Sequence, residues 1–214
     1  MQQLLLDIQH PPVALFDQFV IGQNAELLHH LKGAISSGTN QAEANRFIYL
    51  WGESGSGKTH LLKACEAGEI SVVCVDDVHL LDMNAQIALF NTYNQIRAQN
   101  QLANSLQTAL IVAGNAAPTQ MQLRDDLATR LAWGLSYQVH ALTDEEKALA
   151  LMTHADARGM RLPTDVIEYC LRYLRRDLPT LIATINALDE WSLTMKKPVT
   201  VPMLRQLLQF PMNS

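Results

Sequence analysis

The residue types that can bind phosphate gather in one stretch, residues 47–60, with the sequence FIYLWGESGSGKTH. The spacing G-x-x-x-x-G-K-T is typical of a P-loop, because glycines allow successive backbone N–H groups to turn toward one anion. Lys58 can reach the β- and γ-phosphates of a nucleotide, and Thr59 can place its hydroxyl on Mg²⁺. A helix that begins near Lys58 would direct its positive dipole end at the same anion. The sequence therefore predicts phosphate binding by Gly52, Gly55, Gly57, Lys58 and Thr59.

Two carboxylates and one amide follow other apolar runs. Asp76 and Asp77 come after four apolar residues within the segment SVVCVDDVHLL, and Asn115 follows the run TALIVA. The carboxyl ends of parallel strands face the crevice where ligands bind, so Asp76 would hold Mg²⁺ and Asp77 would orient or deprotonate an attacking water. A helix cap at the strand exit would explain one carboxylate but not two. Asn115 would sense a γ-phosphate, although an asparagine there is also typical of a turn with a left-handed backbone.

The elements that position these groups alternate between buried strands and amphipathic helices. Unbroken apolar runs are typical of parallel strands covered on both faces, and near-helical spacing marks the segments between them. The first part of the chain therefore predicts an α/β fold with a short parallel sheet of four to five strands. Predicted strands lie at 47–51, at the start of 71–81, at 108–113 and at 137–139, and predicted helices at 24–35, 58–65 and 84–99.

After the last predicted strand the pattern indicates helices alone. Thr143 and Glu146 form a capping-box pattern that starts a helix ending at Gly159, and Thr164 is predicted to cap the next helix. We therefore expect an α/β nucleotide-binding domain followed by a small all-α domain. The predicted bounds are 13–141 and 142–214, with further helices at 178–195 and 199–210 in the second domain.

Composition and charge exclude several classes of protein. Hydrophobic residues make up 48% of the chain and charged residues 17%, and the formal net charge is −5. An acidic surface gives no general attraction to nucleic acid or to an anionic membrane, so we expect no direct sequence-specific DNA binding and no membrane association. The cysteines Cys65, Cys74 and Cys170 lie in apolar segments, which indicates reduced core residues of a cytoplasmic protein.

Residues 1–12 form a separate feature, which we predict to be a flexible tether. They end in two prolines that prevent regular structure from continuing. Residues 3–8 have the pattern Q-L-x-L-x-[LI], which in an extended conformation would present apolar side chains and one amide to a groove. The alternative, from the residues alone, is an N-terminal strand that docks on its own domain. The side chains concerned are Gln3, Leu4, Leu6 and Ile8.

Together these motifs resemble the AAA+ class of P-loop proteins, and more narrowly the DnaA-related family that includes Hda-type regulators. The segment GESGSGKTHLL, which adds His60 to the predicted nucleotide-binding residues, is similar to the family's P-loop, and VDDVHLL is similar to its Walker B motif. RDDLATRLAWGL resembles the arginine-finger box, and LRRDLPTL resembles the sensor 2 segment of the helical lid. The resemblance covers about residues 13–210.

The resemblance implies a role for each matching residue. Asp76 would bind Mg²⁺, Asn115 would be sensor 1, and ADP or ATP would be the bound cofactor. Arg130 would act in trans, because the residue that it matches reaches the γ-phosphate held by a neighbouring protein. Arg176, as sensor 2, would reach the phosphate from the lid in cis. A solvated surface position is the plain alternative for each arginine.

Missing segments distinguish the chain from the initiator DnaA itself. The interval between Lys58 and Asp76 is too short for the second strand and the additional helices that carry single-stranded-DNA contacts in the initiator. We also expect no helix-turn-helix domain for duplex DNA after Ser214. Hda-type proteins lack that domain and begin with a short motif that docks on the DNA polymerase III sliding clamp, the beta subunit. Residues 3–8 match that motif.

The resemblance therefore implies a bacterial, cytoplasmic regulator of replication initiation. It would bind the sliding clamp and stimulate hydrolysis of the ATP on DnaA through Arg130, which prevents re-initiation. Its own ATP hydrolysis would be weak or absent, because Asp77 is one methylene shorter than the glutamate common in AAA+ ATPases. Asp126 occupies a position that is often basic in the initiator, which argues against initiator-like filaments but leaves a homo-oligomer open.

Three other functions stay open at this point. An AAA+ ATPase of the helicase-loader type would need single-stranded-DNA contacts, and the sequence offers no basic or aromatic surface for them. A small-molecule P-loop kinase would leave Arg130, Arg176 and the Gln3 motif without a role. A pure adaptor would bind the clamp and ADP without any catalytic contribution.

Overall fold

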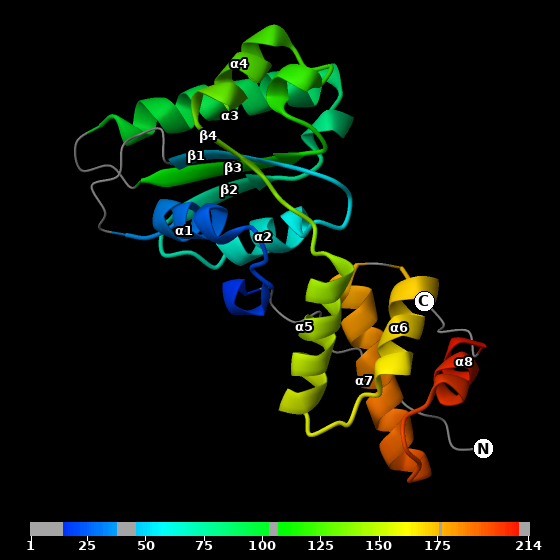
Figure 1. Ribbon diagram of the computed structural model, residues 1–214. Helices are drawn as coiled ribbons and strands as arrows, with labels where there is room; N and C mark the ends of the chain where they lie inside the picture. Colours follow the sequence, from blue (N-terminus) through cyan, green and yellow to red (C-terminus); the bar gives the residue numbers. More distant parts are fainter. Residues whose placement is uncertain (1–14, 38–45, 103–106, 176, 210–214) are drawn as a thin grey trace, which may run out of the picture. The chain divides into compact units, whose positions relative to one another are not determined.

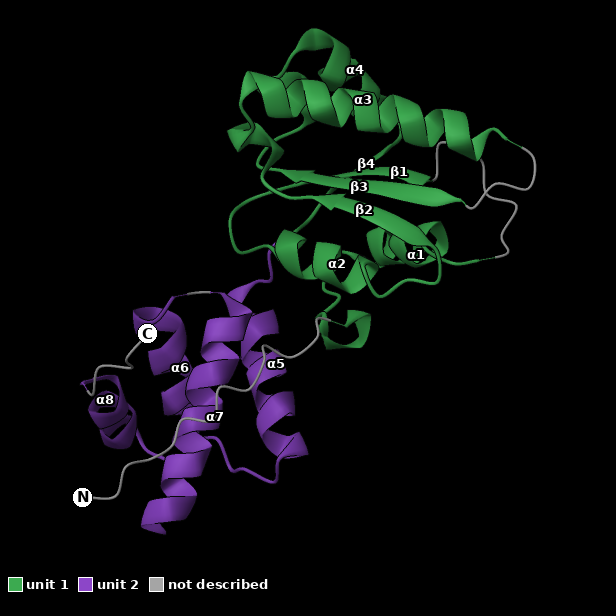
Figure 2. Cartoon of the chain, turned by 180° about the vertical axis from the view of Figure 1, so that it is seen from behind, with its two compact units in different colours: residues 1–140 green, residues 141–214 purple. Residues whose placement is uncertain are grey.

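The computed structural model describes residues 15–37, 46–102, 107–175 and 177–209. The chain divides into two compact units, residues 1–140 and 141–214 (Figure 2). The predicted tether at residues 1–12 lies outside the described residues.

The first unit is built on a four-stranded sheet in which every pair of neighbours is parallel (Figure 1). The strand order is β2-β3-β1-β4, so β3 and β1 are central. Their apolar runs are buried almost throughout, as expected for parallel strands covered on both faces. The predicted α/β fold with four to five parallel strands is confirmed with four. The strands are β1 (Phe47–Trp51), β2 (Ser71–Val75), β3 (Thr108–Gly114) and β4 (Leu135–Gln138).

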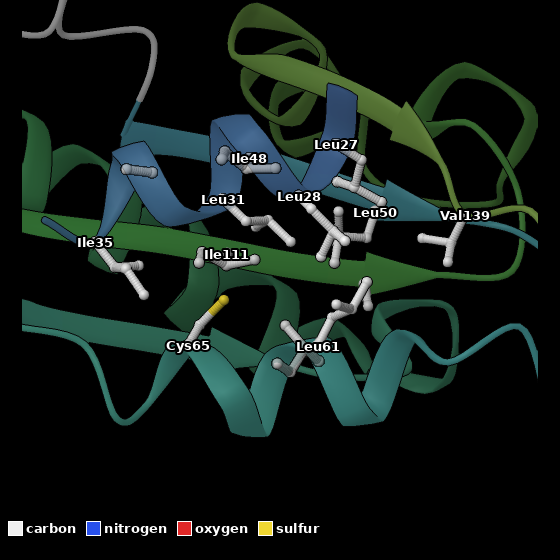
Figure 3. Close-up of a cluster of buried hydrophobic side chains, with 13 residues drawn as sticks. Leu27, Leu28, Leu31, Ile35, Ile48, Leu50, Leu61, Cys65, Ile111 and Val139 are labelled. Carbon is white, nitrogen blue, oxygen red and sulfur yellow. The ribbon is translucent and has the colours of Figure 1, made fainter. Parts of the chain in front are cut away.

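Helices cover both faces of this sheet. Figure 1 shows α1 (Ala25–Ala34) and α2 (Lys58–Cys65) on one face, and α3 (Met83–Asn100) and α4 (Asp125–Trp133) on the other. The buried cluster under α1 and α2 contains apolar residues from both helices and from the central strands (Figure 3). These contacts fix where α2 begins, and with it the end of the P-loop. The cluster includes Leu27, Leu28, Leu31, Leu61, Cys65, Ile48, Leu50 and Ile111.

The opposite face is closed by aromatic packing around Phe47. Its ring lies 4.5 Å from the ring of Tyr93 on α3 and 6.0 Å from the ring of Trp133 on α4. Gly134 ends α4 against the same strand, and a Cβ there would lie 2.1 Å from the Phe47 carbonyl oxygen. The glycine lets α4 end against β1, so β4 begins at Leu135 rather than at the predicted residue 137.

The second unit contains α5 (Asp144–Ala157), α6 (Thr164–Tyr173), α7 (Leu178–Met195) and α8 (Val201–Gln209). The predicted capping box is present, because Thr143 Oγ1 accepts from the Glu146 N–H and the Glu146 carboxylate accepts from the Thr143 N–H. The predicted cap at Thr164 is wrong. Pro163 occupies the N-cap position, and its carbonyl accepts the N–H of Val166, so Thr164 is the first helical residue and caps nothing.

No helix within the described ranges is long and apolar enough to cross a membrane.

Candidate nucleotide site and arginine finger

The loop between β1 and α2 has the backbone shape that its glycines predict. Gly52, Gly55 and Gly57 have φ values of 151°, 81° and 101°. A Cβ at Gly52 would lie 2.5 Å from the Val139 carbonyl oxygen, and one at Gly57 would lie 2.7 Å from Cε2 of Phe19. These positions need glycine both for the dihedral angle and for space. The loop is therefore held between two other segments of the first unit.

Lys58 lies inside this loop and is only 8% exposed. Its Nζ donates hydrogen bonds to the carbonyl oxygens of Gly52 and Glu53, each at 2.8 Å. Burial lowers the pKa of the ammonium group, and the nearby carboxylates of Asp76 and Asp77 act in the opposite direction. The Lys58 ammonium group is therefore held inside the loop. A bound anion could accept the hydrogen bonds that the two carbonyl oxygens accept here.

Asp76 lies against the start of α2. Thr59 Oγ1 donates to Asp76 Oδ2 at 2.5 Å, and the Asp77 N–H donates to Asp76 Oδ1 at 2.8 Å. The second contact depends on an unusual turn, because Asp77 has φ 46° and ψ 45°, in the left-handed region. One hydroxyl and one carboxylate therefore face each other at the end of the P-loop. This pair has the oxygen ligands that Mg²⁺ prefers.

Ser56 is a loop residue whose role the sequence did not indicate. It is 6% exposed, and its Oγ has no hydrogen-bond partner within the described part of the chain. A buried hydroxyl without a partner is costly, and it is acceptable where a bound group supplies the missing hydrogen bond. The unpaired Ser56 hydroxyl, the Lys58 ammonium and the Thr59–Asp76 pair together fit a nucleotide phosphate with Mg²⁺.

His60 faces the N-terminal segment of the first unit. Its Nε2 lies 3.0 Å from the Leu15 carbonyl oxygen, and its ring lies 5.9 Å from the ring of Phe19. Phe19 also fills the space that the missing side chain of Gly57 leaves open. His60 thus connects residues 15–19 to the P-loop, and its contact with a nucleotide stays a prediction.

Asn24 makes a connection that the sequence did not reveal. The side chain is 2% exposed. Its Nδ2 donates to the His140 carbonyl oxygen at 3.0 Å, and its Oδ1 accepts from the His140 N–H at 2.8 Å. Asn24 stands at the N-cap position of α1, where an asparagine is normally read as a helix cap, but its side chain makes no cap hydrogen bond. It instead pairs with the backbone at the end of the first unit, next to the Val139 carbonyl that Gly52 approaches.

Replacing Asn24 with alanine is expected to destabilise the first unit by about 1–3 kcal/mol, because two partly buried backbone groups of His140 lose their partners. Urea unfolding followed by tryptophan fluorescence measures this change. Asn91→Ala, at an exposed position of α3, is the matched control and should change stability by no more than about 0.5 kcal/mol. Equal effects of the two substitutions would show that the pairing with His140 contributes nothing.

The remaining predicted residues do not join this cluster. Asn115 is exposed directly after β3, and the described non-glycine residues with positive φ are Asp77 and Lys196. Asn115 therefore does not have a left-handed backbone. The alternative explanation, a turn residue that tolerates this conformation, does not apply. Its role as a sensor stays a prediction. Arg176 lies outside the described residues.

Arg130 lies half-buried on α4. Its guanidinium carbon is 5.8 Å from the centroid of the Tyr93 ring, and it shares a small cavity with Phe47 and Leu131. In the parts of the chain that the structure describes, no hydrogen bond or ion pair joins Arg130 to the P-loop of its own chain. Its neighbour Asp126 forms a two-point pair with Arg124, at 2.7 and 3.1 Å, and is not directed at Arg130.

Two family models match the chain. Residues 144–208 match the family described as "Hda, lid domain", and residues 12–72 match the family described as "Bacterial DnaA ATPase domain". The first match covers most of the described second unit. The second match includes the P-loop and the Asn24 segment.

Solved structures share the fold. Domain III of the replication initiation protein DnaA from Thermotoga maritima has a TM-score of 0.67 and 18% identity, with 94% of this chain and 98% of that chain covered. AMPPCP-bound DnaA from Aquifex aeolicus has a TM-score of 0.64 and 19% identity, with coverages of 82% and 66%.

A third similar structure is the RuvB Holliday junction branch migration motor of Thermotoga maritima, with a TM-score of 0.61, 15% identity and coverages of 92% and 71%. At these identities the structures show the fold alone. The two family matches, each over part of the chain, together with this fold support an Hda-like protein of the DnaA-homologous AAA+ family.

Proposed function

We propose that this protein regulates replication initiation by stimulating the hydrolysis of ATP bound to DnaA, with Arg130 as an arginine finger that acts in trans. The placement of Arg130 supports the proposal most directly. The guanidinium group lies over Tyr93, on the face of the sheet covered by α3 and α4. Lys58 and Thr59 instead follow the carboxyl end of β1. An arginine held apart from its own P-loop is available to a site on another protein.

The P-loop would hold ADP or ATP. Lys58 and the loop N–H groups would bind the phosphates, Thr59 and Asp76 would bind Mg²⁺, and Arg176 would contribute from the second unit. The metal ion supplies positive charge that neutralises the phosphate oxygens. Asp77 is the candidate base for hydrolysis, and its left-handed turn directs its own N–H to Asp76. We expect turnover at this site to be slow, so the bound nucleotide would serve mainly to keep the α/β domain and the lid in one arrangement.

Catalysis would then take place at the nucleotide of DnaA. The Arg130 guanidinium would stabilise the negative charge that develops on the γ-phosphate oxygens as the bond to the leaving ADP breaks. An arginine suits this role because its planar group carries a fixed charge and several donors. The aromatic ring of Tyr93 would keep the side chain extended and limit the conformations that it loses on binding.

The tether would bring the protein to the DNA polymerase III sliding clamp. Gln3 would supply an amide for hydrogen bonding in the clamp groove, and Leu4, Leu6 and Ile8 would supply apolar anchors. Attachment to a clamp on DNA raises the local concentration of the protein near DnaA, because the second binding step becomes intramolecular. This attachment would restrict inactivation to cells that have begun replication.

Gln3→Ala is expected to abolish retention of the protein by immobilised sliding clamp, while nucleotide binding stays unchanged. Loss of the amide removes a buried hydrogen bond and weakens binding by at least about tenfold. Gln2→Ala is the matched control, since it removes the same group one position outside the motif. Retention of Gln3→Ala at the wild-type level would contradict the proposed docking mode.

A further inference from the structure

The strand that carries Asp76 is an open edge of the sheet. β2 pairs with β3 on one side, and among the described residues no strand lies on its other side (Figure 1 and Figure 2). Within the described residues, Ser71–Val75 takes part in no backbone hydrogen bond besides those to β3. In a parallel pair, alternate residues direct both backbone groups to the neighbour. Every second residue of β2 therefore points an N–H and a carbonyl outward.

The two edges of the sheet differ in how they resist pairing. β4, the other edge, has the sequence LSYQ, with exposed Ser136 and Gln138 at alternate positions. β2 has the sequence SVVCV, without a charge or a proline, and its last four residues are half-buried. Edge strands are normally protected by charges, prolines or bulges. Neither edge contains a charged residue or a proline, but β2 has apolar residues at four of its five positions, whereas β4 has exposed polar residues at alternate positions. β2 therefore offers the more apolar edge to a further strand.

Acidic residues flank β2 at both of its ends, and one of them, Glu69, accepts hydrogen bonds from Ser37. Glu66 and Glu69 are exposed ahead of β2, and Asp77 is exposed after Asp76 at its other end. The segments at both ends of β2 are therefore acidic.

We propose that β2 binds an extended segment of another protein as a fifth strand, one with apolar or β-branched residues between basic residues. The outward backbone groups of β2 would pair with the segment. Its apolar side chains would cover the half-buried valines, and its Lys or Arg residues would lie near Glu66 and Asp77. The bound strand would lie directly beside the residues that lead into Asp76.

Charge separates this occupant from two others. Antiparallel pairing of β2 with a second copy would place Glu66 and Glu69 of one chain beside Asp76 and Asp77 of the other, and like charges oppose that contact. The protein's own residues 1–12 contain Asp7 and no Lys or Arg, so they lack the basic flanks. A basic segment of a different protein is favoured on both counts.

The test uses the full-length protein and a short synthetic peptide of alternating valine and threonine with a lysine at each end. Hydrogen exchange of the outward amides of Ser71–Val75 is expected to slow by about tenfold or more at saturating peptide, with no change in β4. A peptide with glutamate at each end should bind at least about tenfold more weakly at low salt. Glu66→Lys should weaken binding of the lysine peptide. The matched control Glu190→Lys, at an exposed position of α7, should leave that binding unchanged.

Several results would overturn the proposal. They are unchanged exchange in β2 at saturating peptide, equal binding of the lysine and glutamate peptides, or binding that persists when alternate peptide nitrogens are methylated. Protection of β2 that rises with protein concentration alone would assign the edge to a second copy. Faster exchange of β2 after deletion of residues 1–12 would assign it to the protein's own N-terminal segment.

Discussion

Replacing Arg130 with alanine is expected to lower the stimulated rate of hydrolysis of DnaA-bound ATP by a factor of about 10³ or more. Arginine fingers contribute about 10³ to 10⁵ in rate to phosphoryl transfer, because they stabilise charge that exists only in the transition state. The fold should survive, since Arg130 is half-buried and its contact with Tyr93 contributes only about 0.5–1 kcal/mol. Single-turnover hydrolysis of ATP preloaded on DnaA measures the effect.

The chain offers a matched control for this substitution. Arg97 on α3 lies over the ring of Trp133, with its guanidinium carbon 4.8 Å from the ring centroid. Arg97→Ala therefore removes a similar arginine–aromatic contact without removing the proposed finger, and it should leave stimulation within about threefold of wild type. Arg130→Lys should restore little of the stimulated hydrolysis, because lysine cannot reproduce the planar donor group of arginine. Full stimulation by Arg130→Ala would refute the trans mechanism.

Replacing Lys58 with alanine is expected to weaken nucleotide binding by about 10- to 150-fold. A hydrogen bond to a charged group contributes about 1.5–3 kcal/mol, and Lys58 is the buried cation of the loop. Isothermal titration with ADP and Mg²⁺ measures the affinity. Lys58→Met keeps much of the side-chain volume and should lose affinity equally, which separates the missing charge from any collapse of the loop.

Lys63→Ala is the control for Lys58, because it removes the same charge from an exposed position of the same helix. It should change ADP affinity by less than about threefold. Equal losses in Lys58→Ala and Lys63→Ala would mean that general electrostatic attraction, and not the loop, binds the nucleotide.

Much of the sheet could be predicted because its signals are local. Continuous apolar runs define β1 and β3, and the glycine spacing between β1 and α2 predicts a loop that only a few backbone conformations allow. The contact between Thr59 and Asp76 also follows from a general rule. β1 leads into the P-loop and β2 leads into Asp76, and the carboxyl ends of these two parallel strands lie at the same edge of the sheet, with β3 between them.

Contacts between distant segments could not be predicted from a single sequence. Asn24 and His140 are 116 residues apart, and nothing in either local sequence indicates that they pair. The open edge at β2 is likewise a property of strand order, which one chain's hydrophobic pattern does not determine. The unpaired hydroxyl of Ser56 depends on how the loop closes around it, so its residue type alone gave no signal.

The position of Arg130 shows the limit of sequence reasoning about function. The sequence placed it in a segment that resembles the arginine-finger box, and the structure adds helix α4, the ring of Tyr93 and the absence of a described link to its own P-loop. Action in trans requires a second protein, so the proposal depends on an experiment with DnaA.

The central claim is that this protein accelerates hydrolysis of ATP on DnaA when both proteins meet on clamp-loaded DNA. The most direct test loads DnaA with radiolabelled ATP, removes free nucleotide, and follows conversion to DnaA-bound ADP with and without this protein. We predict that conversion is accelerated by about 10³-fold or more with clamp-loaded DNA, and that Arg130→Ala abolishes the acceleration. Unchanged conversion, under conditions where the protein binds both clamp and nucleotide, would contradict the account.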